Sequence, residues 1–205
     1  YCTIRTFLDD VAQPPYRGVA SAGFLRKALV DPAKRRFLGL EQESRGVLVL
    51  FTVPGSPAAD VLRVNDVVLE WDGRPVDNMG FIEDPVFGRV DFSYLIKSRP
   101  PGEAAEVRLM REGNAIDIRL PLRRRTSDWT LIPDNIAAER APYLVEGGMV
   151  LRELTSRYLK GFGANWPRKL NGRLAHLFFT ARHRPSEPGA RVVILSHVLS
   201  DPVNR

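Results

Sequence analysis

The residues of this chain that could do chemistry are three histidines, one cysteine and the serine of a Gly-Ser-Pro turn. His176 and His183 lie seven positions apart, which could place them on one helix face, but no acidic residue between them completes a metal site. Ser56 precedes Pro57, and the sequence contains no Gly-x-Ser-x-Gly pattern for a nucleophilic serine. We therefore expect no catalytic residue, no metal site and no cofactor in this chain.

The single cysteine and the charge balance exclude further classes. Cys2 alone cannot form an intrachain disulfide or a cysteine-based zinc cluster. The net charge is +6, and 25 of the 30 basic residues are arginine, which favours either carboxylate and phosphate recognition or a compositional bias. The densest run, Arg123 to Arg125, has no interleaved aromatic residues, so we do not expect nucleic-acid binding. No apolar run approaches the roughly 20 residues of a membrane span.

The elements that would position a site begin with an amphipathic helix. Ile4, Phe7, Leu8 and Val11 have the spacing of one apolar helix face, and the prolines after Gln13 should end that helix. The chain of 205 residues is 44% hydrophobic, which suffices for one large domain or two small ones. We interpret residues 1–35 as the tail of a preceding domain followed by a linker.

Short strands and turns dominate residues 36–122. Asp31-Pro32 predicts the start of a short helix that ends near Phe37. Asp72-Gly73 and Glu112-Gly113-Asn114 each predict a hairpin between apolar strands. Val90, Tyr94, Leu95 and Ser98 indicate one face of a helix. The pattern predicts a mostly β (α+β) fold, a small closed barrel or sandwich with helices.

A second unit is expected at residues 143–205, after a polar linker at 123–142. Two apolar strands flank Gly147-Gly148, and a further buried-type strand is predicted at 191–196. Between them, residues 155–184 predict helices, the longer one capped by Asn165.

Several motifs in this order resemble a PDZ domain of the circularly permuted type found in HtrA/Deg serine proteases. The resemblance includes the DegP-like branch with two PDZ domains, and residues 1–11 are similar to the last helix of its protease domain. The motifs that carry it are Leu38-Gly39-Leu40, Pro54 to Ala58, Asp66 to Leu69, Asp72 to Val76, Arg89 to Leu95, Pro101-Gly102-Glu103, Val107 to Arg111, Tyr143-Leu144, Gly147 to Val150 and Val192 to Leu199.

The resemblance implies a peptide-binding groove that extends a β-sheet by one strand. We expect Phe37, Leu38, Gly39 and Leu40 to bind the peptide carboxylate through backbone N–H groups, because glycine permits close approach. An edge strand that includes Glu41 would follow this loop. Tyr94, Leu95 and Ser98 would form the helical wall. The alternative for the apolar members of this set is a role in the core.

In the second PDZ-like domain, the matching loop would contain Tyr143, Leu144, Gly147 and Gly148, although the two glycines are also typical of a plain strand turn. The helical insertion at about 155–184 leaves this domain apparently incomplete. No Gly-Asn-Ser-Gly-Gly-like loop of the protease domain occurs in the sequence.

The resemblance implies a region that recognises substrate or regulatory peptides and unfolded segments for an HtrA/Deg-like endopeptidase in protein quality control. It also implies a homo-oligomer built from trimers. Two alternatives remain: a stand-alone PDZ scaffold, and a structural assembly module whose grooves are filled by its own chain. The sequence does not indicate a cellular location.

Overall fold

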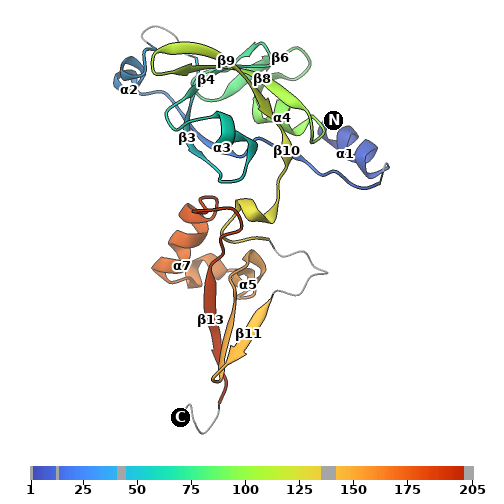
Figure 1. Cartoon of the computed structure of the whole chain (residues 1–205), viewed down its shortest axis with the longest axis vertical. Helices are drawn as coiled ribbons and strands as arrows, with labels where there is room; N and C mark the ends of the chain where they lie inside the picture. Colours follow the sequence, from blue (N-terminus) through green and yellow to red (C-terminus); the bar gives the residue numbers. More distant parts are fainter. Residues whose placement is uncertain (1, 13, 41–44, 135–141, 201–205) are drawn as a thin grey trace. The chain divides into compact units, whose positions relative to one another are not determined.

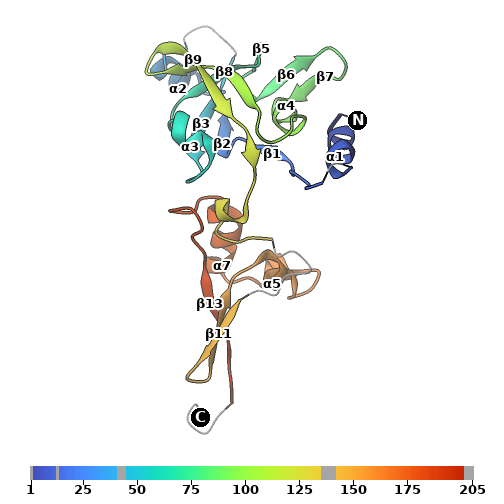
Figure 2. The same ribbon diagram turned by 45° about the vertical axis from the view of Figure 1, so that its right-hand side comes forward.

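The computed structural model describes residues 2–12, 14–40, 45–134 and 142–200. The chain forms two compact units, Tyr1–Thr126 (unit 1) and Ser127–Arg205 (unit 2). Figures 1 and 2 show both units, which are considered separately below. The finer segment boundaries expected from the sequence stay a prediction.

Unit 1 is organised around an antiparallel sheet with two ends. Its order is β2-β3-β4-β8-β9, and β5 pairs with the end of β4. The path does not return from β9 to β2, so the closed barrel that the sequence suggested is wrong, while the mostly β fold with helices is confirmed. The strands are β2 (Phe24–Ala28), β3 (Val47–Thr52), β4 (Val67–Trp71), β5 (Arg74–Pro75), β8 (Ala104–Arg111) and β9 (Asn114–Pro121).

Both predicted hairpins of unit 1 are confirmed. Asp72 and Gly73 connect β4 to β5 with φ of 51° and 73°, and Glu112 and Gly113 connect β8 to β9 with φ of 51° and 78°. Two successive positive φ values match the right-handed twist of the flanking strands. Asn114 pairs with Arg111, so this turn has two residues rather than three.

The helices of unit 1 are short and lie beside the sheet. Helix α1 ends before the prolines as expected, and Asp31 caps α2 by accepting hydrogen bonds from the N–H groups of Ala33 and Lys34. Val90 lies in strand β7, so the predicted helix face from Val90 is wrong at its first member. The remaining elements are α1 (Cys2–Val11), β1 (Ala20–Ser21), α2 (Pro32–Phe37), α3 (Pro57–Val61), β6 (Phe81–Asp84), β7 (Gly88–Asp91), α4 (Ser93–Lys97) and β10 (Arg123–Arg124).

Two apolar clusters stabilise unit 1. The larger contains the fully buried Trp71 and Phe92 and joins α3 and α4 to one face of the sheet. The smaller packs Leu29 and Leu40 against Leu48, Val67 and Leu69 on the other face. Burial of a large apolar side chain contributes about 1.5–3 kcal/mol, so these clusters determine where α4 and the end of α2 lie.

Unit 2 contains a three-stranded antiparallel sheet and a group of short helices around Ile132, Leu154 and Leu159. The predicted long helix from Asn165 is wrong: Leu170 is extended, and Asn171 starts a new helix by accepting from the N–H of Leu174. The elements are η1 (Ser127–Trp129), β11 (Tyr143–Glu146), β12 (Met149–Glu153), α5 (Ser156–Lys160), α6 (Trp166–Lys169), α7 (Gly172–His176), η2 (Leu177–Ala181) and β13 (Val193–Val198).

Candidate functional site

A recess beside an open strand lies between β2 and α4 of unit 1. Strand β2 is an end of the sheet, so one side of its backbone is not paired within that sheet. A cavity of about 150 Å³ runs along this side. We refer to it as the β2–α4 groove; its lining residues are Ala20, Ser21, Ala22, Gly23, Phe24, Arg26, Phe92, Ser93, Ile96 and Lys97.

Gly23 directly precedes β2, and the backbone N–H groups of Gly23 and Phe24 are directed away from the sheet. Its carbonyl accepts from the N–H of Val53 at 2.8 Å and from Ser56 Oγ at 2.9 Å, and the carbonyl of Ala22 accepts from Ala58 at 3.0 Å. Because N–H and C=O point in opposite directions across a trans peptide, the N–H groups of Gly23 and Phe24 face away from these partners. Gly23 has φ of 82°. Neighbouring backbone N–H groups that face the same way can bind an anion.

The floor of the groove is aromatic and buried. The ring of Phe24 stacks on Trp71 at 6.3 Å, and Trp71 contacts Phe92 at 5.2 Å. Ile96 of α4 is 8% exposed and completes the apolar surface. An apolar cavity of about 150 Å³ can hold benzene, so the groove has room for one aliphatic or single-ring side chain.

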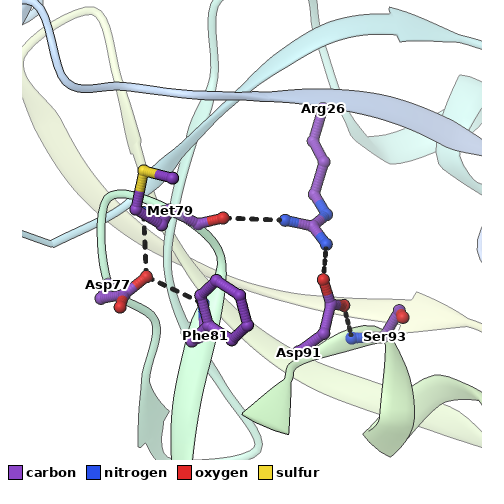
Figure 3. Close-up of polar contacts among 6 residues, drawn as sticks. All are labelled: Arg26, Asp77, Met79, Phe81, Asp91 and Ser93. Carbon is purple, nitrogen blue, oxygen red and sulfur yellow. Dashed lines mark hydrogen bonds and ion pairs between the residues drawn. The ribbon is translucent and has the colours of Figure 1, made fainter. Parts of the chain in front are cut away.

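The other end of the groove is charged. Arg26 lies two residues after Phe24 on the same strand, and its guanidinium contacts the Asp91 carboxylate and the Met79 carbonyl (Figure 3). The guanidinium carbon also lies 4.6 Å from the centre of the Phe92 ring. Arg26 therefore links the edge strand β2 to the β6–β7 hairpin and to the start of α4. The β6–β7 hairpin and α4 lie next to each other in Figure 2.

Asp91 is held in its ionised form. Partial burial raises the pKa of this carboxyl, but hydrogen bonds from Ser93 and the ion pair with Arg26 outweigh burial, so its pKa lies below the usual value. The Asp91 carboxylate accepts from the Ser93 N–H at 2.9 Å, which fixes the first turn of α4. In the same view, Asp77 accepts from the N–H groups of Met79 and Phe81 and orders the preceding turn (Figure 3).

The predicted carboxylate loop lies elsewhere, at the end of α2. The N–H groups of Leu38, Gly39 and Leu40 all donate to carbonyls of that helix, at 3.0–3.1 Å. Phe37 is 82% exposed, whereas Leu40 is buried in the smaller cluster. Glu41 lies outside the described residues. The edge strand expected after Leu40 falls on residues 41–43, which also lie outside the described residues. The N–H groups of Leu38, Gly39 and Leu40 are already used within the end of α2.

Of the residues predicted to form the helical wall, Tyr94 and Leu95 lie on α4, and Ser98 directly follows it. Tyr94 turns toward the β6–β7 hairpin, where its ring meets Phe87 at 5.6 Å, and Leu95 packs against the larger cluster. Ser98 caps the helix and donates to the Leu95 carbonyl at 3.2 Å. The α4 residues that line the groove are instead Ser93, Ile96 and Lys97.

The second predicted loop is a strand turn. Tyr143 and Leu144 lie on β11, and Gly147-Gly148 connects β11 to β12 with Glu146 paired to Met149. Tyr143 and Leu144 are 71% and 54% exposed, so they do not line a closed pocket within unit 2.

Sequence reasoning missed the segment Ser21-Ala22-Gly23-Phe24. Its signal is a glycine between small residues and an aromatic residue, directly before a short strand-like stretch. Leu38-Gly39-Leu40 also has a glycine next to apolar residues, but only the residues after Gly23 form a strand, which pairs with β3.

The described parts of the chain contain no group of three or more metal-ligating side chains. Within those same parts, none of the helices is long and apolar enough to cross a membrane.

PDZ domains bind an extended peptide that adds a strand to an exposed sheet edge. A family model described as a PDZ domain matches residues 132–205, in unit 2. Residues 132–205 are thus similar to PDZ domains, and the chain is similar in sequence to Deg-type proteases.

Its relatives include two proteins of Arabidopsis thaliana. Protease Do-like 2, chloroplastic, is 29% identical over 98% of this chain and 32% of its own length. Putative protease Do-like 3, mitochondrial, is 26% identical over 83% of this chain and 28% of its own length. The chain thus spans about a third of these relatives. A solved structure, HtrA-type protease AlgW with tripeptide, has a TM-score of 0.44 and 20% identity over 58% of this chain and 36% of its own.

Proposed function

We propose that the β2–α4 groove binds the C-terminal tails of polypeptides by strand addition. The observation that supports this most directly is the pair of outward N–H groups at Gly23 and Phe24, at the start of an unpaired strand edge. A peptide antiparallel to β2 would place its carboxylate at this turn and its last side chain over Phe24 and Ile96. The room available favours an aliphatic or single-ring terminal residue.

The test is fluorescence-polarisation binding of short peptides with an apolar last residue, each synthesised as the free acid and as the amide. Saturable binding of the acid, with the amide at least tenfold weaker, supports capture of the carboxylate. Ser93→Trp would fill the groove from the first turn of α4 and should abolish binding. Equal binding of acid and amide would rule out the role of Gly23 and Phe24.

Two variants separate the two glycine loops. Gly23→Ala adds a Cβ at a left-handed φ and should weaken binding. Phe37→Ala removes an exposed ring beside the loop that the sequence favoured and should leave binding unchanged. The opposite pattern would return the site to residues 37–40. Thermal unfolding of each variant shows whether a loss of binding reflects a loss of fold.

For the longer protein, we propose that this region delivers peptides or unfolded segments to an HtrA/Deg-type serine endopeptidase and supports its oligomer. The proposal is supported by relatives named as proteases, of which the chain spans about a third. Digestion of an unfolded protein by the full-length enzyme, with and without Ser93→Trp, tests delivery. Light scattering of the same samples tests for a trimer-based assembly. Unchanged digestion would leave a scaffold or assembly role.

A further inference from the structure

Arg26 occupies the position in the β2–α4 groove that faces the third residue from the end of a bound peptide. Side chains of a strand alternate between faces, so Phe24 and Arg26 point to the same side of β2. The register confirms this: the irregularity between Leu25 and Arg26 skips Leu50 on β3 and leaves β2 without an inserted residue. An added strand that places its last side chain over Phe24 brings its third-last side chain toward Arg26 and Ser93.

The Arg26 guanidinium has more N–H donors than it has partners among the described residues. A guanidinium has five N–H donors, and among the described residues those of Arg26 have two partners, the Asp91 carboxylate and the Met79 carbonyl at 3.5 Å. The side chain remains 24% exposed. Both oxygens of Asp91 already accept hydrogen bonds, from Ser93 and from Arg26. A further acidic group therefore finds free donors here, whereas a basic group would have to displace Arg26.

The guanidinium is also held in place before any ligand arrives. Gly80 provides the space, because a Cβ at this position would overlap the guanidinium of Arg26. Phe92 supplies a ring face at 4.6 Å. Rotamer freedom that is already lost in the free protein is not lost again on binding, which favours tight recognition.

The charges of the groove also favour an acidic ligand. Arg26 and Lys97 line it and Asp91 adjoins it, which leaves one positive charge in excess. Resting on the proposed function, we propose that the β2–α4 groove selects C-terminal tails that carry an aspartate or glutamate at the third residue from the end, and that Arg26 reads this carboxylate.

The experiment compares four peptides that are identical except for Glu, Gln, Ala or Lys at the third-last position, all as free acids with an apolar last residue. We expect the Glu peptide to bind about tenfold more tightly than the Gln peptide, the size of a charge-assisted hydrogen bond. In Arg26→Gln the ratio of the two affinities should fall to near one. Arg26→Lys should retain only part of it, because ammonium cannot form the planar fork.

Matched controls separate Arg26 from general basic charge and from strain. Lys27→Gln removes the adjacent positive charge, which is exposed on the opposite face of β2, and should preserve the ratio. Gly80→Ala should reduce the ratio because it displaces the guanidinium. Gly88→Ala, at a similar positive φ with open space around it, should not.

Each outcome has a distinct meaning. Equal binding of all four peptides overturns the selectivity and leaves the proposed function standing. Tighter binding of the Lys peptide also overturns the selectivity and would indicate that Asp91 recognises the third-last residue. If none of the four peptides binds wild-type protein, the proposed function itself fails, and the selectivity fails with it.

Discussion

The hydroxyl of Ser56 donates a 2.9 Å hydrogen bond to the carbonyl oxygen of Gly23, and Ser56 is fully buried. This bond connects the turn before α3 to the residue that directly precedes β2. It directs the Gly23 carbonyl into the unit and thereby directs the Phe24 N–H outward. The geometry of the open edge thus depends on a residue 33 positions away in the sequence.

Ser56→Ala should lower the free energy of unfolding of unit 1 by about 1 kcal/mol, because one buried hydrogen bond is lost while the Gly23 carbonyl keeps the bond from Val53. Urea unfolding monitored by tryptophan fluorescence measures the change. Ser186→Ala, at an exposed position of unit 2, is the control and should change nothing. Equal effects of the two variants would contradict the assigned role of Ser56.

Gly39→Ala should destabilise unit 1 more than Gly73→Ala. The two glycines have φ of 77° and 73°, so a Cβ costs each a similar left-handed penalty of about 1–2 kcal/mol. At Gly39 the Cβ would also lie 3.3 Å from the Gly113 Cα, whereas Gly73 has nothing within 4 Å. Denaturant midpoints of the two variants give the comparison. A smaller loss for Gly39→Ala would mean that the hairpin tip moves freely.

Local signals were sufficient to predict much of the fold. Asp31-Pro32 correctly predicted the start of α2, and Asp72-Gly73 correctly predicted a hairpin, because caps and two-residue turns depend on neighbours in the sequence. The long helix expected from Asn165 was wrong because a second cap at Asn171 competes with the apolar pattern.

The β2–α4 groove was harder to predict because it depends on which strands pair in the sheet. Gly23 and Gly39 both have positive φ and lie next to apolar residues. The N–H groups of Gly23 and Phe24 face the open side of β2, which ends the described sheet, while those of Leu38 and Gly39 close the last turn of α2. The Arg26–Asp91 ion pair joins residues 65 positions apart, a relationship that composition and spacing do not reveal.

Asp66→Ala should destabilise unit 1 by about 3 kcal/mol, since it leaves a half-buried arginine without its charge partner. Asp66 is 1% exposed and accepts from Arg111 Nε at 2.8 Å and Nη2 at 2.6 Å. Asp117→Ala is the matched control: its pair with Arg108 is exposed, with 3.9 Å between the charged atoms, and should contribute about 0–1 kcal/mol. Urea unfolding tests both, and a double-mutant cycle with Arg111→Met separates the pair energy from packing. Similar losses at Asp66 and Asp117 would refute this assignment.

The stability of the β6–β7 hairpin should depend on acid through Asp84. A hydrogen bond and ion pair from Arg74, together with N–H donors from Val86 and Phe87, lower the pKa of this carboxyl below its usual value. Because the folded-state pKa is the lower one, the ionised carboxylate stabilises the fold fully above the unfolded pKa, and this contribution is lost as the pH falls through the folded pKa. Between pH 7 and 5, Asp84 should therefore not change the free energy of unfolding. Below about pH 4, the free energy of unfolding should decline.

Asp84→Asn should have a lower stability at pH 7 and a shallower decline in acid than the wild type, because the titrating group is gone. Arg74→Gln keeps the carboxyl but removes its ion-pair partner at 2.6 Å, so it should also flatten the acid limb, though less completely. Urea unfolding at pH 7, 5, 4, 3 and 2 gives the free energies for all three proteins. If the three curves run parallel down to pH 2, Asp84 does not couple the hairpin to protonation, and the acid limb must come from the other aspartates whose pKa is lowered, Asp10, Asp77 and Asp91 in unit 1 and Asp134 in unit 2.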